Sequence, residues 1–189
     1  MHKRIKKDRN LIPFPNKKYK IIYADPAWYF KTYSNKGNKR SAMLHYNCLN
    51  IHDIYNLPVN TISDNDCILF LWAIDPMLPE AMEVIKRWGF KFKTVAFTWV
   101  KENKKSDGYF TGLGYWTRAN PEICLLATKG KPKRISKAVR QLIISKRQEH
   151  SKKPDEIRDR IIQLCGDLPK IELFARQRVE GWDCWGNEV

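Results

Sequence analysis

The chain of 189 residues is 43% hydrophobic and 12% aromatic, enough apolar material for one hydrophobic core, so we expect a single domain. It has no apolar run long enough to cross a bilayer, no apolar segment after its basic start that could serve as a secretion signal, and no Cys-x-x-Cys pair among five cysteines. These exclusions favour a cytoplasmic protein with reduced thiols and no membrane partner, and the net charge of +15 predicts a polyanionic partner such as nucleic acid.

The positive charge is concentrated in two stretches. Residues 1–20 carry eight Lys or Arg against one acid, and residues 129–153 carry ten against Glu149 alone. Two basic stretches indicate a track for a phosphate backbone, although a solvated surface or an anionic membrane contact are alternatives. The backbone contacts are assigned to five residues of the second stretch, Lys131, Lys133, Arg134, Lys137 and Arg140.

Residues 1–18, with two prolines, are expected to form a basic flexible arm, and residues 19–189 a single domain. The apolar run 21–23 is typical of a buried strand that delivers the next residues to the edge of a sheet. Asp25-Pro26-Ala27-Trp28 follows this run directly.

The chemistry of this tetrapeptide suits a planar base that carries an exocyclic amine. Asp25 can hold a polar hydrogen, Pro26 leaves its carbonyl free to accept another, and Trp28 offers a flat face for stacking. A simple turn is the alternative interpretation, because Asp-Pro often ends a strand.

Strands alternate with helices along the rest of the chain. The patterns predict helices at 52–55, 78–88 and from Pro154 to before Gly166, and strands at 67–73, 92–100, 122–128 and, as the last strand, 170–174. Polar loops are expected at 31–50 and 101–118, and the basic residues 129–150 have no assigned structure.

The strand, helix and strand of residues 67–100 predict parallel strands joined by a right-handed crossover. The expected fold class is therefore α/β, with a mostly parallel sheet flanked by helices. Asp25 and the residues after Phe174 should meet at its carboxyl edge, where such sheets bind ligands.

Five motifs in order carry a resemblance to a known family. They are Asp25-Pro26-Ala27-Trp28, Trp99-Val100-Lys101, His150-Ser151-Lys152-Lys153-Pro154-Asp155-Glu156, Ile171-Glu172-Leu173-Phe174-Ala175-Arg176 and Gly181-Trp182-Asp183-Cys184-Trp185-Gly186-Asn187-Glu188. From about Tyr19 to its C-terminus the chain resembles the MT-A70 family of adenine-N6 methyltransferases, with the length and spacings of the bacterial and phage members.

The resemblance implies a Rossmann-like methyltransferase fold with a permuted motif order. It also implies methyl transfer from S-adenosylmethionine to N6 of adenine in nucleic acid, with DNA as the favoured substrate. It implies a catalytic motif of Asp25, Pro26, Ala27 and Trp28, in which Asp25 and the Pro26 carbonyl hold the amine and Trp28 stacks beside the base. The implied cofactor-binding residues are Asp25, Lys153, Glu172, Phe174, Arg176, Asn187 and Glu188, and the implied base pocket is Tyr46, Lys101 and Glu122.

Several alternatives stay open. Ala27 stands where the family usually has Pro, which removes a restriction on Pro26 and keeps a non-catalytic, nucleic-acid-binding partner of another methyltransferase in view. RNA is the other substrate to consider, and the protein could act as a monomer or a homodimer. His45, Cys48 and His52 have a spacing that zinc sites use, but with no fourth ligand nearby we expect no metal.

Overall fold

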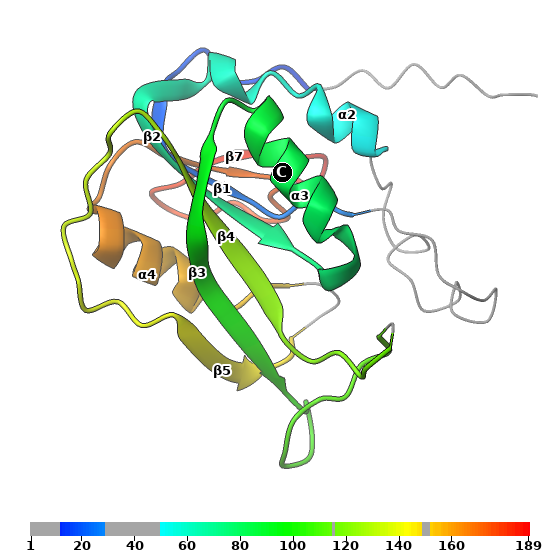
Figure 1. Cartoon of the computed structure of the whole chain (residues 1–189). Coiled ribbons are helices and arrows are strands. Elements are labelled where there is room, and N and C mark those ends of the chain that lie inside the picture. Colours follow the sequence, from blue (N-terminus) through cyan, green and yellow to red (C-terminus); the bar gives the residue numbers. More distant parts are fainter. Residues whose placement is uncertain (1–11, 29–49, 115, 149–151) are drawn as a thin grey trace, which may run out of the picture.

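The computed structural model describes residues 12–28, 50–114, 116–148 and 152–189 (Figure 1). Within these ranges the strands are β1 (Tyr19–Ala24), β2 (Ser63–Ala73), β3 (Lys91–Glu102), β4 (Glu122–Lys129), β5 (Leu142–Lys146), β6 (Lys170–Leu173) and β7 (Asp183–Trp185). The helices are α2 (Ile51–Tyr55), α3 (Leu78–Arg87) and α4 (Glu156–Cys165), with 3-10 turns at Val59–Thr61 and Asp75–Met77. None of the helices described here has the length and apolar character needed to cross a membrane.

The seven described strands form one mixed sheet in the order β5-β3-β4-β2-β1-β6-β7. Strand β4 pairs antiparallel with β2 and β3, whereas the other four pairings are parallel. Six of these strands therefore point one way and β4 points the other. As a consequence, the first residue of β4 lies at the edge where its neighbours β2 and β3 end.

The position of β4 corrects one expectation. The strands on either side of α3 do point the same way, but β4 lies between them, so β2 and β3 are not paired. The reason is the connection between β3 and β4, which in the described residues contains no helix and returns the chain as a hairpin rather than a crossover.

Alternate residues of β1 and β2 feed two hydrophobic cores, one on each face of the sheet. Ile22 and Leu69 belong to the core that α3 covers, and Ile21 and Phe70 to the core that α4 covers. Figure 1 shows these two helices on opposite faces of the sheet. Three tryptophans expected in the core are buried there, Trp72, Trp88 and Trp99.

The predicted strands and helices are confirmed in place, with ends that shift by a few residues. Two short strands were not predicted. β5 lies inside the basic stretch 129–150, where the only apolar signal is Leu142-Ile143-Ile144, and β7 makes the expectation that residues 170–174 form the last strand wrong. β7 has only three residues and extends the sheet beside β6.

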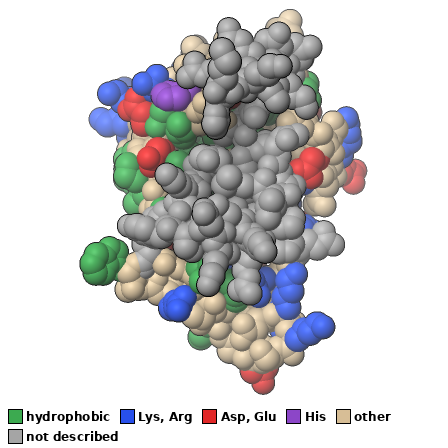
Figure 2. All heavy atoms as spheres, turned by 90° about the vertical axis from the view of Figure 1, so that its right-hand side faces the viewer, with side chains coloured by type: hydrophobic (Ala, Val, Ile, Leu, Met, Phe, Trp, Pro, Cys, Tyr) green, Lys and Arg blue, Asp and Glu red, His purple; other side chains and the backbone are tan. Residues whose placement is uncertain are grey.

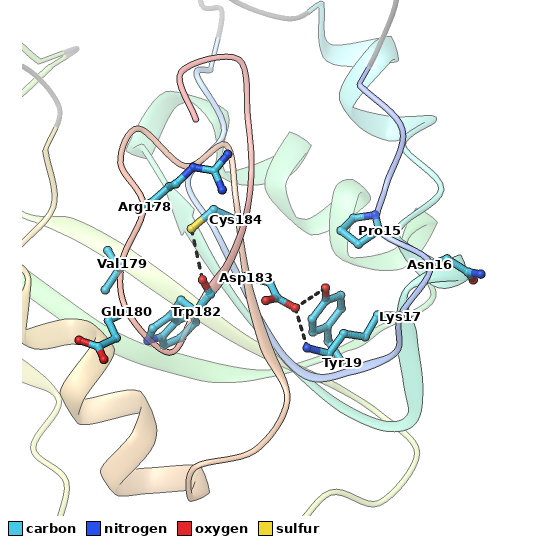
Figure 3. Close-up of a pocket in the computed structure, with 10 residues that line it drawn as sticks. All are labelled: Pro15, Asn16, Lys17, Tyr19, Arg178, Val179, Glu180, Trp182, Asp183 and Cys184. Atoms are coloured by element: carbon cyan, nitrogen blue, oxygen red, sulfur yellow. Dashed lines mark hydrogen bonds and ion pairs between the residues drawn. The ribbon is translucent and has the colours of Figure 1, made fainter.

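The described part of the expected N-terminal arm, residues 12–18, packs against β7. The Trp185 indole donates to the Ile12 carbonyl at 2.9 Å, and the Phe14 and Trp185 rings lie 4.7 Å apart. Lys17 and the Tyr19 hydroxyl both bond to Asp183, at 2.8 and 2.7 Å. Lys17, Tyr19 and Asp183 line one side of a surface cavity of about 560 Å³ at the amino ends of β1 and β7, at the opposite edge of the sheet from Asp25 (Figure 3).

Candidate active site

Four charged side chains from distant parts of the chain meet at the carboxyl edge of the sheet. The Lys153 ammonium nitrogen lies 2.7 Å from an Asp25 carboxylate oxygen and 3.2 Å from a Glu122 oxygen. Lys101 contacts the other Glu122 oxygen at 2.7 Å. Their side chains are only 10–20% exposed, so these ion pairs are shielded from water.

The topology brings these four residues together. Asp25 follows the last residue of β1, and Lys101 is the penultimate residue of β3. Glu122 starts β4, opposite Trp99, and reaches the same edge because β4 runs in reverse. Lys153 stands in the segment just before α4. The expected convergence of Asp25, Lys153, Lys101 and Glu122 is thus what the structure shows, whereas Tyr46 lies outside the described residues.

Asp25 and Glu122 share Lys153 but differ in acidity. Burial raises the pKa of Asp25 above its usual value, and the charges of Lys153 and Arg176 offset this only in part. Burial acts on Glu122 in the same direction, but Lys153 and Lys101 outweigh it and lower its pKa to about 2. Burial alone would lower the pKa of Lys153, yet the two carboxylates raise it, so its ammonium stays charged. Asp25 is therefore the more basic of the two carboxylates.

The segment after Asp25 is anchored to the neighbouring strands. The Asp25 amide donates to the Leu173 carbonyl of β6, Pro26 is buried, and Ala27 is half-buried. The Trp28 indole donates to the Trp72 carbonyl at 3.0 Å, and the side chain is only 5% exposed. In this structure Trp28 therefore fixes the segment to β2, and stacking on a base stays a prediction.

The end of β6 forms the second half of the site. Glu172 makes a two-point contact with Arg158 of α4, at 2.8 and 3.0 Å. The backbone of Phe174 has a φ of +61°, a conformation that residues other than Gly rarely adopt. The Phe174 ring packs edge-on against Trp185. This turn carries the chain on to Arg176, whose charge acts on Asp25.

The C-terminal motif lies directly beside this turn. The Ala175 amide donates to the Trp185 carbonyl at 3.0 Å. A Cβ atom at Gly186 would lie 2.5 Å from the Ala175 carbonyl oxygen, so only glycine fits there. Asn187 and Glu188 follow and are exposed. The residues assigned to the cofactor from β6 and from the C-terminus are therefore neighbours in space.

Two contributors to the site were missed by the sequence reasoning. Arg158 sits beside Ile157 on the sheet-facing side of α4, and a charged residue on such a face needs a buried partner, which is a usable signal. Trp72 supplies the carbonyl for Trp28, and its ring lies 5.2 Å below the Lys153 ammonium group. Nothing in the pattern of β2 sets Trp72 apart from an ordinary core residue.

The five residues assigned to the nucleic-acid backbone are all exposed, Lys131, Lys133, Arg134, Lys137 and Arg140. Their segment leaves β4 at the edge of the sheet opposite Asp25 and passes the end of α4, where the Ile135 amide donates to the Leu164 carbonyl at 2.8 Å. It then enters β5 (Figure 1). The tract is thus accessible but begins away from the charged cluster.

Figure 2 looks at the side of the molecule on which Figure 1 shows the carboxyl ends of the central strands, and Lys and Arg side chains flank this face.

Two residues of the zinc alternative, His45 and Cys48, lie outside the residues that the structure describes, and His52 is exposed on α2. Cys165 is buried and Cys184 is half-buried.

Comparison with known proteins identifies the family. The MT-A70 profile matches residues 19–188. The chain is 38% identical to the type II methyltransferase M.MunI of a Mycoplasma species, over 93% of this chain and 79% of the relative. It is 28% identical to the N(6)-adenosine-methyltransferase catalytic subunit METTL3 of Homo sapiens and 27% identical to an MT-A70-like N(6)-adenosine-methyltransferase of Arabidopsis thaliana, over 91% and 89% of this chain.

The chain spans 79% of the bacterial relative but only 28% and 23% of the human and plant relatives. The family profile covers nearly the whole chain, and the motifs that it shares with the family frame the buried cluster at the carboxyl edge. This protein therefore belongs to the MT-A70 family of adenine-N6 methyltransferases.

Proposed function

We propose that the protein transfers a methyl group from S-adenosylmethionine to N6 of adenine in DNA. The observation that carries the proposal is the buried Asp25 carboxylate at the carboxyl edge, fixed by Lys153 at 2.7 Å and followed by the Pro26 carbonyl. Two acceptors at the end of a rigid strand can bind the two hydrogens of an amine and fix its orientation.

The adenine amine is a weak nucleophile because its lone pair is delocalised into the ring. Hydrogen bonds to Asp25 and to the Pro26 carbonyl rotate the amine so that the lone pair points toward the methyl donor. When bound, S-adenosylmethionine would supply the methyl group that N6 accepts, and Asp25 and the Pro26 carbonyl would hold N6 in line with it. The proton lost from N6 passes to Asp25, whose raised pKa makes it a better acceptor than an exposed aspartate.

The residues around Asp25 fit S-adenosylmethionine by their chemistry. When bound, the cofactor supplies a methyl group on a positively charged sulfur. Lys153 and Arg176 are the cations for its carboxylate, and Asp25 is the anion beside the sulfonium. Glu172 and the exposed Asn187 and Glu188 supply polar groups for the ribose, next to the turn at Phe174. Because β1 precedes β6 in the chain, this division agrees with a permuted motif order.

DNA is the proposed substrate for two reasons. The net charge of +15 and the exposed tract at residues 131–140 suit a long phosphate backbone. The bacterial type II methyltransferase also matches at higher identity, and over far more of its own length, than the eukaryotic N(6)-adenosine-methyltransferases.

Incubation with methyl-labelled S-adenosylmethionine and unmethylated genomic DNA tests the proposal. We expect label on N6 of adenine with the native chain and none with Asp25→Asn, while both proteins bind DNA equally, because duplex affinity comes from Lys and Arg side chains. Asp183→Asn is the matched control, since it removes a carboxylate that also pairs with a lysine, but at the opposite edge of the sheet. Unchanged turnover by Asp25→Asn in a folded protein contradicts the assignment.

Ala27 favours a second candidate, a nucleic-acid-binding subunit that does not catalyse. Without a proline at position 27, the Pro26 carbonyl is held less firmly toward the amine. This candidate predicts salt-sensitive DNA binding without cofactor binding. Isothermal titration calorimetry with S-adenosylmethionine separates the two, because a micromolar dissociation constant is incompatible with a subunit that has lost its cofactor site.

A further inference from the structure

The connection between β3 and β4, residues 103–121, leaves the sheet at the same edge as the charged cluster (Figure 1). Its base is bonded to Lys101. The Phe110 amide donates to the Lys101 carbonyl at 2.8 Å, and the Asn120 side chain both accepts from the Lys101 amide at 3.0 Å and donates to its carbonyl at 2.9 Å. Because Lys101 also contacts Glu122, the loop is coupled directly to the site.

The outer part of this loop is a tight turn. The Gly112 amide donates to the Ala119 carbonyl at 2.7 Å and closes the turn. Inside it, a Cβ atom at Gly114 would lie 2.0 Å from the Thr117 carbonyl oxygen, so the turn can form only with glycine at this position. The contact between Gly112 and Ala119 limits the tip to a reach of about 10 Å beyond that contact.

Trp116 lies in this turn and is completely exposed, with a relative accessibility of 103%. The other six tryptophans of the chain are between 0% and 7% exposed. Leu113, in the same turn, is 61% exposed. A fully exposed indole beside the catalytic edge is an apolar surface, and we expect a partner to cover it when the protein works.

The surroundings of Trp116 favour nucleic acid as that partner. Lys104, Lys105 and Arg118 of the same loop are exposed, against the single exposed acid Asp107. A base that is to be methylated in a duplex must first leave the stack, which leaves a gap that a flat side chain can fill. Indole rings stack on bases of any sequence.

We propose that Trp116 inserts into duplex DNA beside the target adenine and occupies the space that the flipped base leaves. The inference rests on the proposed function for the identity of the base, but the insertion itself can be measured without methyl transfer. Lys104, Lys105 and Arg118 contact the phosphates around the insertion point, and the bonds at Lys101 fix the base of the loop beside the charged cluster.

Tryptophan fluorescence measures the insertion directly, because acrylamide can reach only Trp116 among the seven tryptophans. We expect an excess of unmethylated genomic DNA to quench part of the emission and to protect the remainder from acrylamide. Heparin, a polyanion without bases, should bind through the basic residues and change neither signal. Trp116→Phe should remove the DNA-dependent change, and Gly114→Ala should reduce it because the turn is distorted.

Methylation of synthetic duplexes gives a second readout, once sequencing of the labelled DNA has identified the target. Trp116→Ala should lose about tenfold in rate when the adenine is paired, and much less when it lies opposite an abasic site, where no base pair must be broken. Met82→Ala, an exposed apolar residue in the middle of α3, is the control and should behave as the native chain.

Three results would overturn the inference. They are unchanged acrylamide access in saturating duplex DNA, equal loss by Trp116→Ala on paired and unpaired targets, and protection of Trp116 that rises with protein concentration in the absence of DNA, which would assign the surface to a second copy of the chain. If no DNA is methylated, the proposed function is wrong. The fluorescence measurement then decides by itself whether Trp116 inserts into DNA.

Discussion

Glu122 and Asp25 show how strongly the pKa of a buried carboxylate depends on the charged groups around it. Glu122 faces two ammonium groups, from Lys101 and Lys153, whereas Asp25 has Lys153 as its ion-pair partner. Burial penalises both charges, but only at Glu122 do the lysines prevail. One residue is thus held as a permanent anion that keeps Lys153 in place, and the other keeps a basicity suited to accepting a proton.

The acidity of Glu122 predicts a pH dependence of stability. Its pKa falls from 4.5 to about 2 on folding, so the unfolded chain binds more protons between these values and the stabilisation is lost as the pH drops from 4.5 toward 2. The shift corresponds to roughly 3 kcal/mol. Urea unfolding across this pH range should therefore show a flatter dependence for Glu122→Gln than for the native chain.

Asp107→Asn is the control for this measurement, because Asp107 is an exposed acid on the β3–β4 loop. Its unfolding curves should follow the native pH dependence. If Glu122→Gln also follows the native curve, Glu122 is not held as an anion by its two lysines.

At the scale of elements, the ion pair between Arg158 and Glu172 joins α4 to β6. Both side chains are largely buried, and burial raises the pKa of Glu172 while Arg158 opposes that rise. Arg158→Ala leaves a buried carboxylate without a partner, so we expect the free energy of unfolding to fall by about 3 to 5 kcal/mol. Chemical denaturation at pH 7 measures this loss.

Arg87 of α3 is the matched control, since it contacts Glu83 at 2.7 Å in an exposed pair on another helix. Arg87→Ala should cost less than about 1 kcal/mol. The double variant of Arg158 and Glu172 to Met should recover much of the lost stability, because apolar side chains of similar volume need no partner. If Arg158→Ala and Arg87→Ala lower the free energy of unfolding equally, α4 and β6 do not depend on the pair between Arg158 and Glu172.

The elements that could be predicted from the sequence are those with strong periodic patterns. The apolar run of β2 predicts a strand, and the apolar spacing of α3 predicts a helix. Because ligands bind at the carboxyl edge of such sheets, Asp25 was expected near the residues after Phe174, and Arg176 does act on it. The direction of β4 could not be read from its own residues, because its continuous apolar run carries no direction. The missing helix in the long connection before Glu122 was the available signal for a hairpin.

The candidate site was less predictable than the fold. Lys153, Lys101 and Glu122 were assigned through the family resemblance, since a lysine in a basic stretch looks like any other surface charge. The exposed Trp116 and the buried Trp72 have equally little signal, because burial of a tryptophan is decided by topology rather than by its neighbours in sequence.

At the scale of the whole molecule, the start of the basic tract and the active edge lie at opposite ends of β4. The eight residues of β4 span about 24 Å, so the segment that begins at Lys131 starts roughly that far from Glu122. At about 3.4 Å per base pair, this separation corresponds to about seven base pairs along a duplex. The first residues of the tract are therefore placed to contact phosphates beyond one side of the target adenine, whereas the last, Arg140, precedes Gln141, whose carbonyl accepts from Thr98 near the active edge.

This geometry predicts how a charge-depleted variant should behave. Replacing Lys131, Lys133, Arg134 and Lys137 together by Gln should weaken duplex binding, make the logarithmic salt dependence shallower by up to about 3 to 4, and leave the affinity for S-adenosylmethionine unchanged. Replacing Lys18, Lys20, Lys86 and Lys93, which are also exposed, removes the same charge elsewhere and should change the salt dependence less. Equal effects of the two sets would mean that net charge, and not the tract, sets the affinity.

The length of the duplex supplies the sharper test, because it asks where the tract binds. Salt-dependent titrations should use duplexes in which the target adenine has long flanks, or fewer than about six base pairs on one side. Shortening the side that the tract contacts should weaken binding by the native chain as much as the four substitutions do, and should have no further effect on the substituted chain. Shortening the other side should affect both proteins alike. If neither flank matters to the native chain, the tract does not follow the duplex and its positive charge serves only to attract DNA from a distance.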